Sequence, residues 1–423
     1  MKKIFALLLA AMLAVGTLAS CGTPAVDDEN NDAQGEVVDN AGTEEKEEEK
    51  EEKSALEDIK IGFIFLHDEN STYDKNFIDA AKAAQKALGL TDDQVIYKVN
   101  VPESNDCYEA AADMADAGCD IVFADSFGHE SFMVQAAKEF PEVMFCHATG
   151  TTAHTEKLPN FYNAFANIYE GRFLVGVAAG LKLNEMIEAG KITADQAKMG
   201  YVGAFPYAEV KSGYTSFYLG AKSVCPTVTM DVKFTNSWFD IAKEKETANA
   251  LINDKCVLIS QHADSEGAPK ACEEAGVPNV AYNLNTVEWG PNTALVSSKI
   301  NWQPYFEHII NAVANGTEIE QDFCKGLKEE VVQILPINDK VAAEGTAAKL
   351  DEVKAKLMAG EIKVFDTATF TVKGETLTEY LADVDSDAAF TPDTNVIADG
   401  YFHESEYRSA PYFDIDIDGI TIK

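Results

Sequence analysis

The sequence predicts an α/β protein with two doubly wound lobes and a ligand cleft between them. Three observations lead to this prediction. Short apolar runs, rich in β-branched and aromatic residues, alternate with helical patterns from residue 59 to about residue 316, which is typical of sheets covered by helices. The alternation falls into two similar series, with strands placed to cross between them. Loops with aromatic and polar side chains follow several strands, at the sheet edge where ligands bind.

The first series describes one lobe, for which we expect residues 58–165 and a return segment at about 300–336. Its first apolar run, 59–66, is too short to span a membrane and ends in polar residues. Apolar residues then recur at helical spacing from Tyr73 to Leu88. The same patterns predict strands at 94–99, 120–124 and 143–147, and helices at 108–117 and 132–139.

The second series describes the other lobe, for which we expect residues 166–299 and part of 337–423. Crossing strands are expected at 160–167 and 294–300. Between them the patterns predict helices at 170–183, 208–223, 241–252 and 268–274, and strands at 199–205, 228–236, 256–260 and 279–283. After a helix at 302–314 the pattern weakens, and we expect a hairpin at 326–336, a helix at 339–358 and short strands beyond.

The amino-terminal residues predict an exported, lipid-anchored protein. Lys2 and Lys3 precede an apolar run at 4–18, which gives a signal peptide at 1–20. Cys21 follows Leu-Ala-Ser and resembles the lipidated cysteine of a bacterial lipobox. Residues 21–56 are rich in glutamate and lack aromatic residues, so we expect a disordered acidic tether. The expected location is the outer side of the cytoplasmic membrane, with the lipid as the only membrane contact.

Charge and cysteine content narrow the range of partners. The formal net charge of −37 argues against nucleic acid, because binding a phosphate backbone requires a basic surface. Neutral or cationic small molecules remain possible ligands. Besides Cys21 there are seven cysteines without CxxC spacing, which suggests neither a disulfide framework nor a zinc site. We expect no cofactor, no bound metal and a monomeric protein.

Loops at the predicted strand ends place aromatic rings beside carboxylates and amides. Aromatic faces from opposing lobes can clamp a planar ring, while polar side chains read its edges. The pattern therefore predicts a site for a flat ligand with polar edges. The candidate residues are Tyr73, Asp74, Asp125, Ser126, Phe127, Trp238, Asp264, Asn283 and Trp302.

Several candidates also fit a structural role. Tyr73 and Asp74 suit the first turn of a helix, where the dipole favours a carboxylate. Trp238 can pack on the start of the next helix, Phe127 can cover the sheet, and the spacing of Trp302 fits a helix core. The histidines of loops and strand ends are interpreted as structural residues: His129, His147 and His262.

Enzymatic interpretations have less support. The sequence has no GxSxG, HExxH or P-loop motif. Cys146 and His147 are adjacent and project to opposite faces of a strand, which disfavours a nucleophile–base pair. Asp74, Asp125 and Asp264 remain an alternative hydrolytic or metal site, although they lack the clustered spacing of a metal-binding loop.

Ordered sequence blocks over residues 58–336 resemble the basic membrane protein family, the PnrA-like substrate-binding lipoproteins of ABC importers. The resemblance implies a type I periplasmic-binding fold and a non-enzymatic protein that delivers its ligand to an ABC permease. Known members bind purine nucleosides, and the branch with Trp-Phe-Asp and Asn-Trp motifs resembles one that binds adenine or a related purine. The blocks are 73–77 (YDKNF), 125–128 (DSFG), 169–176 (YEGRFLVG), 200–206 (GYVGAFP), 236–240 (NSWFD) and 301–305 (NWQPY).

The resemblance also implies roles for individual residues. Tyr73 and Trp238 would sandwich the base, and Asp74 and Asp125 would read its edge, with residues 126–127 on the same wall. Nucleoside-binding members surround the ribose with a Gly-Gly turn, an aspartate and a lysine.

This chain departs from that ribose pattern at each of its three parts. It has QHAD at 261–264, Asn283 or Asn285 in place of the aspartate, and Lys299 out of register. We therefore expect a free, adenine-like purine base, with a purine nucleoside as the main alternative. A sugar-binding protein, an extracellular nucleoside hydrolase and a sensory lipoprotein are further alternatives.

Overall fold

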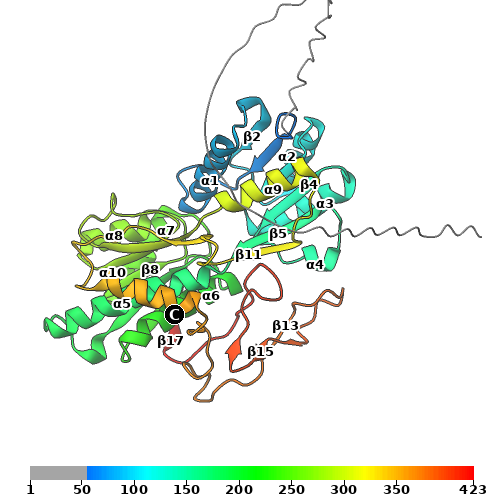
Figure 1. Ribbon diagram of the computed structural model, residues 1–423. Coiled ribbons are helices and arrows are strands. Elements are labelled where there is room, and N and C mark those ends of the chain that lie inside the picture. The colour runs from blue at the N-terminus through cyan, green and yellow to red at the C-terminus, as the bar shows by residue number, and fades with distance from the viewer. Residues whose placement is uncertain (1–54) are drawn as a thin grey trace, which may run out of the picture. The chain divides into compact units, whose positions relative to one another are not determined.

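The computed structural model describes residues 55–423 (Figure 1). The predicted signal peptide, the predicted lipidation site Cys21 and the tether up to residue 54 lie outside the described residues. None of the helices that the structure describes is long and apolar enough to cross a membrane.

The first lobe is built on a parallel six-stranded sheet in the order β11-β5-β4-β3-β1-β2. Helices α1 and α9 pack against each other, as do α2 and α3, and two apolar clusters fill the space between helices and strands. The strands are β1 (Ile61–Ile64), β2 (Val95–Lys98), β3 (Ile121–Ala124), β4 (Met144–Ala148), β5 (Phe161–Ala166) and β11 (Asp322–Lys325). The helices are α1 (Thr72–Leu88), α2 (Asn105–Asp116), α3 (Glu130–Glu139), the short α4 (Ala153–Glu156) and α9 (Gln303–Asn315).

The second lobe is built on a seven-stranded sheet in the order β12-β10-β9-β8-β6-β7-β17, in which only β12 runs antiparallel to its neighbour among the described strands. Figure 1 shows α7 and α8 on one side of this sheet and α5, α6 and α10 on the other. The strands are β6 (Lys198–Gly203), β7 (Thr229–Phe234), β8 (Leu258–Gln261), β9 (Asn279–Tyr282), β10 (Ala294–Ile300), β12 (Val332–Ile334) and β17 (Ile420–Ile422). The helices are α5 (Ile168–Glu188), α6 (Ala208–Val224), α7 (Ile241–Asn253), α8 (Gly267–Ala275) and α10 (Thr346–Met358).

Helices α5 and α6 make the closest helix–helix contact of the second lobe, because glycines face backbone across it. A Cβ atom on Gly176 would lie 2.1 Å from the carbonyl oxygen of Phe217, and one on Gly220 would lie 2.0 Å from that of Phe173. Neither position has room for a side chain. Gly176 and Gly220 therefore serve the close packing of these two helices.

The chain passes between the two sheets three times: after β5, after β10, and between β11 and β12. The last crossing shows that the predicted hairpin at 326–336 is wrong. β11 pairs with β5 in the first sheet, whereas β12 pairs with β10 in the second, inside the segment 300–336 that we assigned to the first lobe. The predicted helix at 339–358 begins only at Thr346, after Gly345 in a left-handed conformation.

The carboxyl-terminal segment, residues 359–423, contains short paired strands and a stacked ring pair, Phe365 and Phe413, with centroids 4.4 Å apart. Its contacts reach both lobes. Ser409 donates two hydrogen bonds to Asp322 at the start of β11, and Lys211 of α6 forms an ion pair with Asp414 at 2.7 Å. The short strands are β13 (Leu381–Ala382), β14 (Thr394–Asn395), β15 (Ile397–Ala398) and β16 (Tyr401–Phe402).

Candidate functional site

A narrow cavity lies between the two lobes, at the carboxyl ends of the parallel strands. Its volume is only about 20 Å³, far less than the roughly 300–1,000 Å³ of typical ligand pockets, so the lobes are packed closely around it. Six of the nine candidate ligand-binding residues line it: Tyr73, Asp74, Ser126, Phe127, Trp238 and Asp264. Sequence analysis did not assign the other lining residues to the site: Leu66, His67, Thr149, Glu209 and His262.

Two aromatic rings reach the cavity from opposite lobes. Tyr73 lies in the first turn of α1, where its hydroxyl donates to the carbonyl of Asp125 at 2.8 Å. Its ring packs edge-on against Phe77 of the same helix, with centroids 4.9 Å apart. Trp238 follows β7 in the second lobe and packs edge-on against Phe205 at 5.0 Å. Each ring is thus held by a neighbour in its own lobe and is positioned before any ligand binds.

Asp74 supplies a buried, ionised carboxylate on the first-lobe wall. Burial alone would raise its pKa, but hydrogen bonds from His67 and Ser71 hold the pKa of Asp74 below its ordinary value. The backbone N–H of His67 donates to Oδ1 at 2.7 Å and the hydroxyl of Ser71 to Oδ2 at 2.6 Å. Ser71 also caps α1, because its side chain accepts from the backbone N–H of Asp74. Asp74 is therefore an acceptor at neutral pH.

Asp264 supplies a carboxyl group of opposite character on the second-lobe wall. Burial, followed by the charges of Glu244 and Asp74, raises the pKa of Asp264 well above its usual range. The raised pKa favours the protonated carboxyl, which can donate a hydrogen bond. Its Oδ1 is buried and has no hydrogen-bond partner among the described residues. Since buried polar atoms are normally paired, this oxygen is suited to a ligand in the cavity.

His262 lies beside Asp264 and lines the cavity, so its interpretation as a purely structural residue needs correction. Burial and the charge of Arg172 lower its pKa, which keeps the imidazole neutral. Nε2 lies 3.3 Å from Glu209, whereas Nδ1 is buried and unpaired within residues 55–423. His129 and His147 share this pattern, with Nε2 on the carbonyls of Val101 and Ser126 and an Nδ1 without a hydrogen-bond partner among the described residues, but neither of them lines the cavity.

The lobes contact each other around the cavity in a closed arrangement. The backbone N–H of Thr72 donates to the carbonyl of Asp264 at 2.8 Å, which joins the start of α1 to the second-lobe wall. The side chain of Asn76 donates to the carbonyl of Ile300 at the end of β10. Separation of these contacts would move the two walls of the cavity apart.

Three candidate residues are not among those that line the cavity. Asp125 lies behind the first-lobe wall, where its Oδ1 accepts from the N–H of Leu66 at 3.1 Å. Burial and the nearby charge of Asp74 raise the pKa of Asp125. Asp125 touches the site through Leu66 and Tyr73. Asn283 is buried at the end of β9 with φ of 69°.

Trp302 is the third, and the structure places it in the core of the first lobe. It is 1% exposed, and its ring stacks on Phe77 with centroids 4.4 Å apart. It also contacts Phe123 and Tyr305. The residue precedes α9, and the amphipathic pattern of that helix turns the indole toward the sheet rather than toward the cavity.

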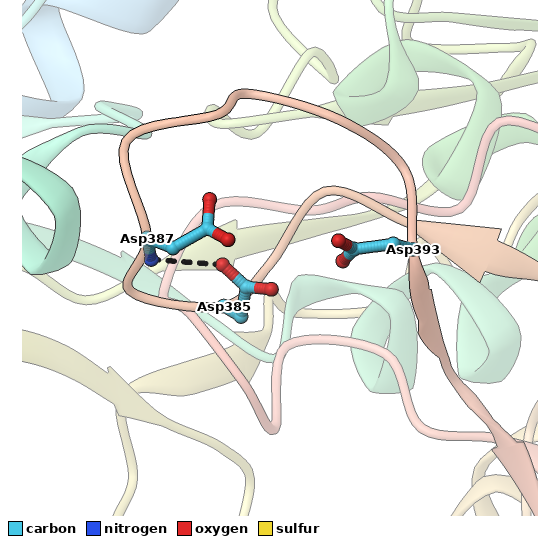
Figure 2. Close-up of side chains that lie close together, drawn as sticks. All are labelled: Asp385, Asp387 and Asp393. Atoms are coloured by element: carbon cyan, nitrogen blue, oxygen red, sulfur yellow. Dashed lines mark hydrogen bonds between the residues drawn. The ribbon is translucent and has the colours of Figure 1, made fainter.

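A metal site made of Asp74, Asp125 and Asp264 is not present among the described residues. The one group of three carboxylates close enough to share an ion there is Asp385, Asp387 and Asp393 (Figure 2). Figure 2 shows them in one exposed loop, with the N–H of Asp387 bonded to Asp385. Exposed acidic groups of this kind are common without an ion. The seven cysteines that the structure describes are free.

Comparison with known proteins adds to this geometry. The model of a family described as ABC transporter substrate-binding protein PnrA-like matches residues 63–368. A purine-binding protein of Brucella abortus is 34% identical over 331 residues, which cover 76% of this chain and 89% of that protein. A putative ABC transporter glucose-binding protein of Haloferax volcanii is 29% identical over 259 residues, which cover 60% of this chain and 61% of that protein.

Solved structures confirm the predicted α/β fold with two doubly wound lobes. An ABC transporter solute-binding protein from Aeropyrum pernix has a TM-score of 0.62 at 18% identity, covering 73% of this chain and 93% of that one. Another, from Conexibacter woesei, has a TM-score of 0.57 at 19% identity, covering 72% and 98%. At these identities the likeness concerns the fold alone.

Proposed function

We propose that this chain, which belongs to the PnrA-like family of ABC transporter substrate-binding proteins, binds an adenine-like purine base and delivers it to the permease of an importer. The observation that carries the proposal is the pair of rings, Tyr73 and Trp238, offered to one closed cavity by opposite lobes. Stacking on both faces suits a flat heterocycle and requires the lobes to close over it.

The polar walls of the cavity support a purine ligand because they offer both a hydrogen-bond acceptor and a hydrogen-bond donor. Ionised Asp74 accepts, as an exocyclic amine or ring N–H requires. Asp264, whose raised pKa favours the protonated form, can donate, as an unprotonated ring nitrogen requires. Adenine carries both kinds of group along its edges. The departures from the ribose pattern at 261–264, Asn283 and Lys299 favour the base over the nucleoside, and the name of the Brucella relative supports a purine.

A sugar is the second candidate, and the Haloferax relative named as a putative glucose-binding protein favours it. The two ligands place different demands on the site. A sugar uses hydroxyl groups around its whole rim, whereas a purine depends on stacking over both faces. The proposal also implies that the ligand is returned unchanged, which separates it from a nucleoside hydrolase.

A screen of ligands against the purified protein tests the proposal. A ligand that binds only the folded state raises the melting temperature in proportion to the logarithm of its concentration above Kd. We expect stabilisation by adenine, less by adenosine and none by glucose, with each purine recovered intact by chromatography. Stabilisation by glucose alone would overturn the purine assignment, and cleavage of adenosine would point to a hydrolase.

Trp238→Ala is expected to weaken adenine binding by about 1–3 kcal/mol, the range found when one base-stacking ring is removed. That corresponds to a rise in Kd of about fivefold to 150-fold by titration calorimetry. Tyr407→Ala is the matched control, because Tyr407 is an exposed ring that does not line the cavity. Equal affinities for both variants would remove Trp238 from the site.

The anchor and the location remain part of the proposal. The Leu-Ala-Ser-Cys sequence ending at Cys21 supports cleavage before that residue and its lipidation. A monomer held at the outer side of the cytoplasmic membrane would then hand the ligand to the permease. Mass spectrometry of the mature amino terminus tests this directly, since an unmodified Cys21 argues against the anchor.

A further inference from the structure

A second cavity, here called the outer chamber, adjoins the ligand cavity. It measures about 230 Å³ and shares three lining residues with the ligand cavity: Phe127, Thr149 and Glu209. The two spaces are therefore neighbours. Phe127 lines both of them and remains 40% exposed.

The far wall of the outer chamber comes from residues 408–414, beyond the region that matches the family model. This wall is fixed against both lobes. Ser409 bonds to Asp322 in the first lobe, and Asp414 pairs with Lys211 in the second. The chamber is thus a built part of the closed protein, and its size is set by a segment outside that region.

The charged groups around the chamber have partners elsewhere. Asp414 is paired with Lys211, and Arg408 donates through Nη1 to the carbonyl of Asp383 at 3.0 Å. Glu209 lies 3.3 Å from His262. Because these three charged groups already have partners, the rest of the chamber wall is mainly apolar. The wall carries two carboxylates and one guanidinium, so its charge disfavours binding of an anion. The apolar lining residues are Phe127, Pro206, Tyr207, Ala208, Ala410 and Pro411.

Two rings from opposite lobes stand at this chamber. Phe127 and Tyr207 stack with centroids 5.4 Å apart, yet they remain 40% and 43% exposed. Large apolar side chains with that much exposed surface beside a ligand cavity are suited to contact with a ligand.

We propose that the outer chamber receives an apolar substituent of the bound purine, so that the protein accepts adenines carrying an alkyl or aryl group. This inference rests on the proposed function, since it places the purine ring itself in the inner cavity. The ring stacks between Tyr73 and Trp238, and the substituent passes Phe127 to lie against Tyr207 and Pro411.

Titration calorimetry with adenine, N6-benzyladenine and 9-benzyladenine tests the inference. We expect wild-type protein to bind adenine and at least one benzyl derivative. Ala208→Phe adds a ring to the chamber at the first position of α6 and should weaken the bound derivative at least tenfold while changing adenine less than twofold. Ala347→Phe, at the exposed second position of α10, is the matched control and should change neither.

Tyr207→Ala provides a second test that does not add volume. It should lower the affinity for the benzyl derivative relative to adenine by about fivefold or more. If Ala208→Phe does not fold, this variant alone tests whether the substituent lies in the outer chamber. Two outcomes would overturn the inference and leave the proposed function intact. In the first, the protein binds adenine but neither benzyl derivative. In the second, neither variant changes the ratio of the affinities for the benzyl derivative and adenine. Failure of all three purines would overturn the proposed function itself.

Discussion

Replacing Trp302 with alanine should lower the free energy of unfolding by about 3–5 kcal/mol, the usual cost of truncating a buried tryptophan. The indole is 1% exposed and stacks on Phe77 between α1 and α9. Its removal leaves a void that α1 and α9 cannot close, because both helices are also held against the sheet. Urea denaturation followed by far-UV circular dichroism measures the loss.

The same variant separates a core residue from a ligand-binding one. Adenine affinity, measured well below the unfolding transition, should stay within about threefold of wild type. Phe390→Ala serves as the control, since Phe390 is 56% exposed and should cost under about 0.5 kcal/mol. A stable Trp302→Ala protein that loses ligand would return Trp302 to the site and contradict its placement here.

Glu404→Gln should remove a pH-dependent loss of stability. Glu404 is buried in the carboxyl-terminal segment, where Oε1 accepts from the N–H of Tyr412 and Oε2 has no partner among the residues described. Burial raises the pKa of Glu404 to about 8. Between its ordinary value and pH 8 the unfolded chain releases this proton while the folded chain keeps it.

This difference in bound protons determines whether stability rises or falls with pH. Rising pH favours the form with fewer protons, so the unfolding free energy should fall by roughly 1.4 kcal/mol per pH unit from this residue across that interval. The contribution is fully present below pH 4.5 and lost by pH 8. Glu404→Gln should therefore gain stability over wild type as pH rises from 5 to 8. Glu344→Gln, at an exposed position, should follow the wild-type curve, and parallel curves for Glu404→Gln would contradict a buried, protonated carboxyl.

Local patterns in the sequence predicted most of the secondary structure because strand and helix periodicities differ clearly. The run at 59–66 contains β1, and the apolar spacing after Tyr73 corresponds to α1. The pairing between strands that are distant in sequence could not be predicted in this way. β11 and β12 look like neighbours in sequence but join different sheets, and β17 pairs with β7 nearly two hundred residues away. Nothing in a short window of sequence specifies such partners.

The candidate site was predicted where chemistry and position agreed. Tyr73 and Trp238 combine an aromatic ring with a place in the segment that follows a strand, and the structure brings both to one cavity. Thr149 follows β4 and Glu209 lies in the first turn of α6, but a threonine and a glutamate are too common in such places to stand out. Trp302 was also a candidate, and the structure places it in the core of the first lobe, which its helical spacing also fitted.

Strand β17 also affects how the protein behaves in concentrated solution. Without it, β7 would be the outer strand of its sheet, with free N–H and C=O groups able to recruit a second molecule. The pairing of Ile420 with Met230, continued by the N–H of Lys423 on the carbonyl of Val232, occupies those groups within the same chain. β17 is three residues long and is followed by a lysine, which makes it a poor template in turn. Its pairing therefore guards this face of the molecule against edge-to-edge aggregation.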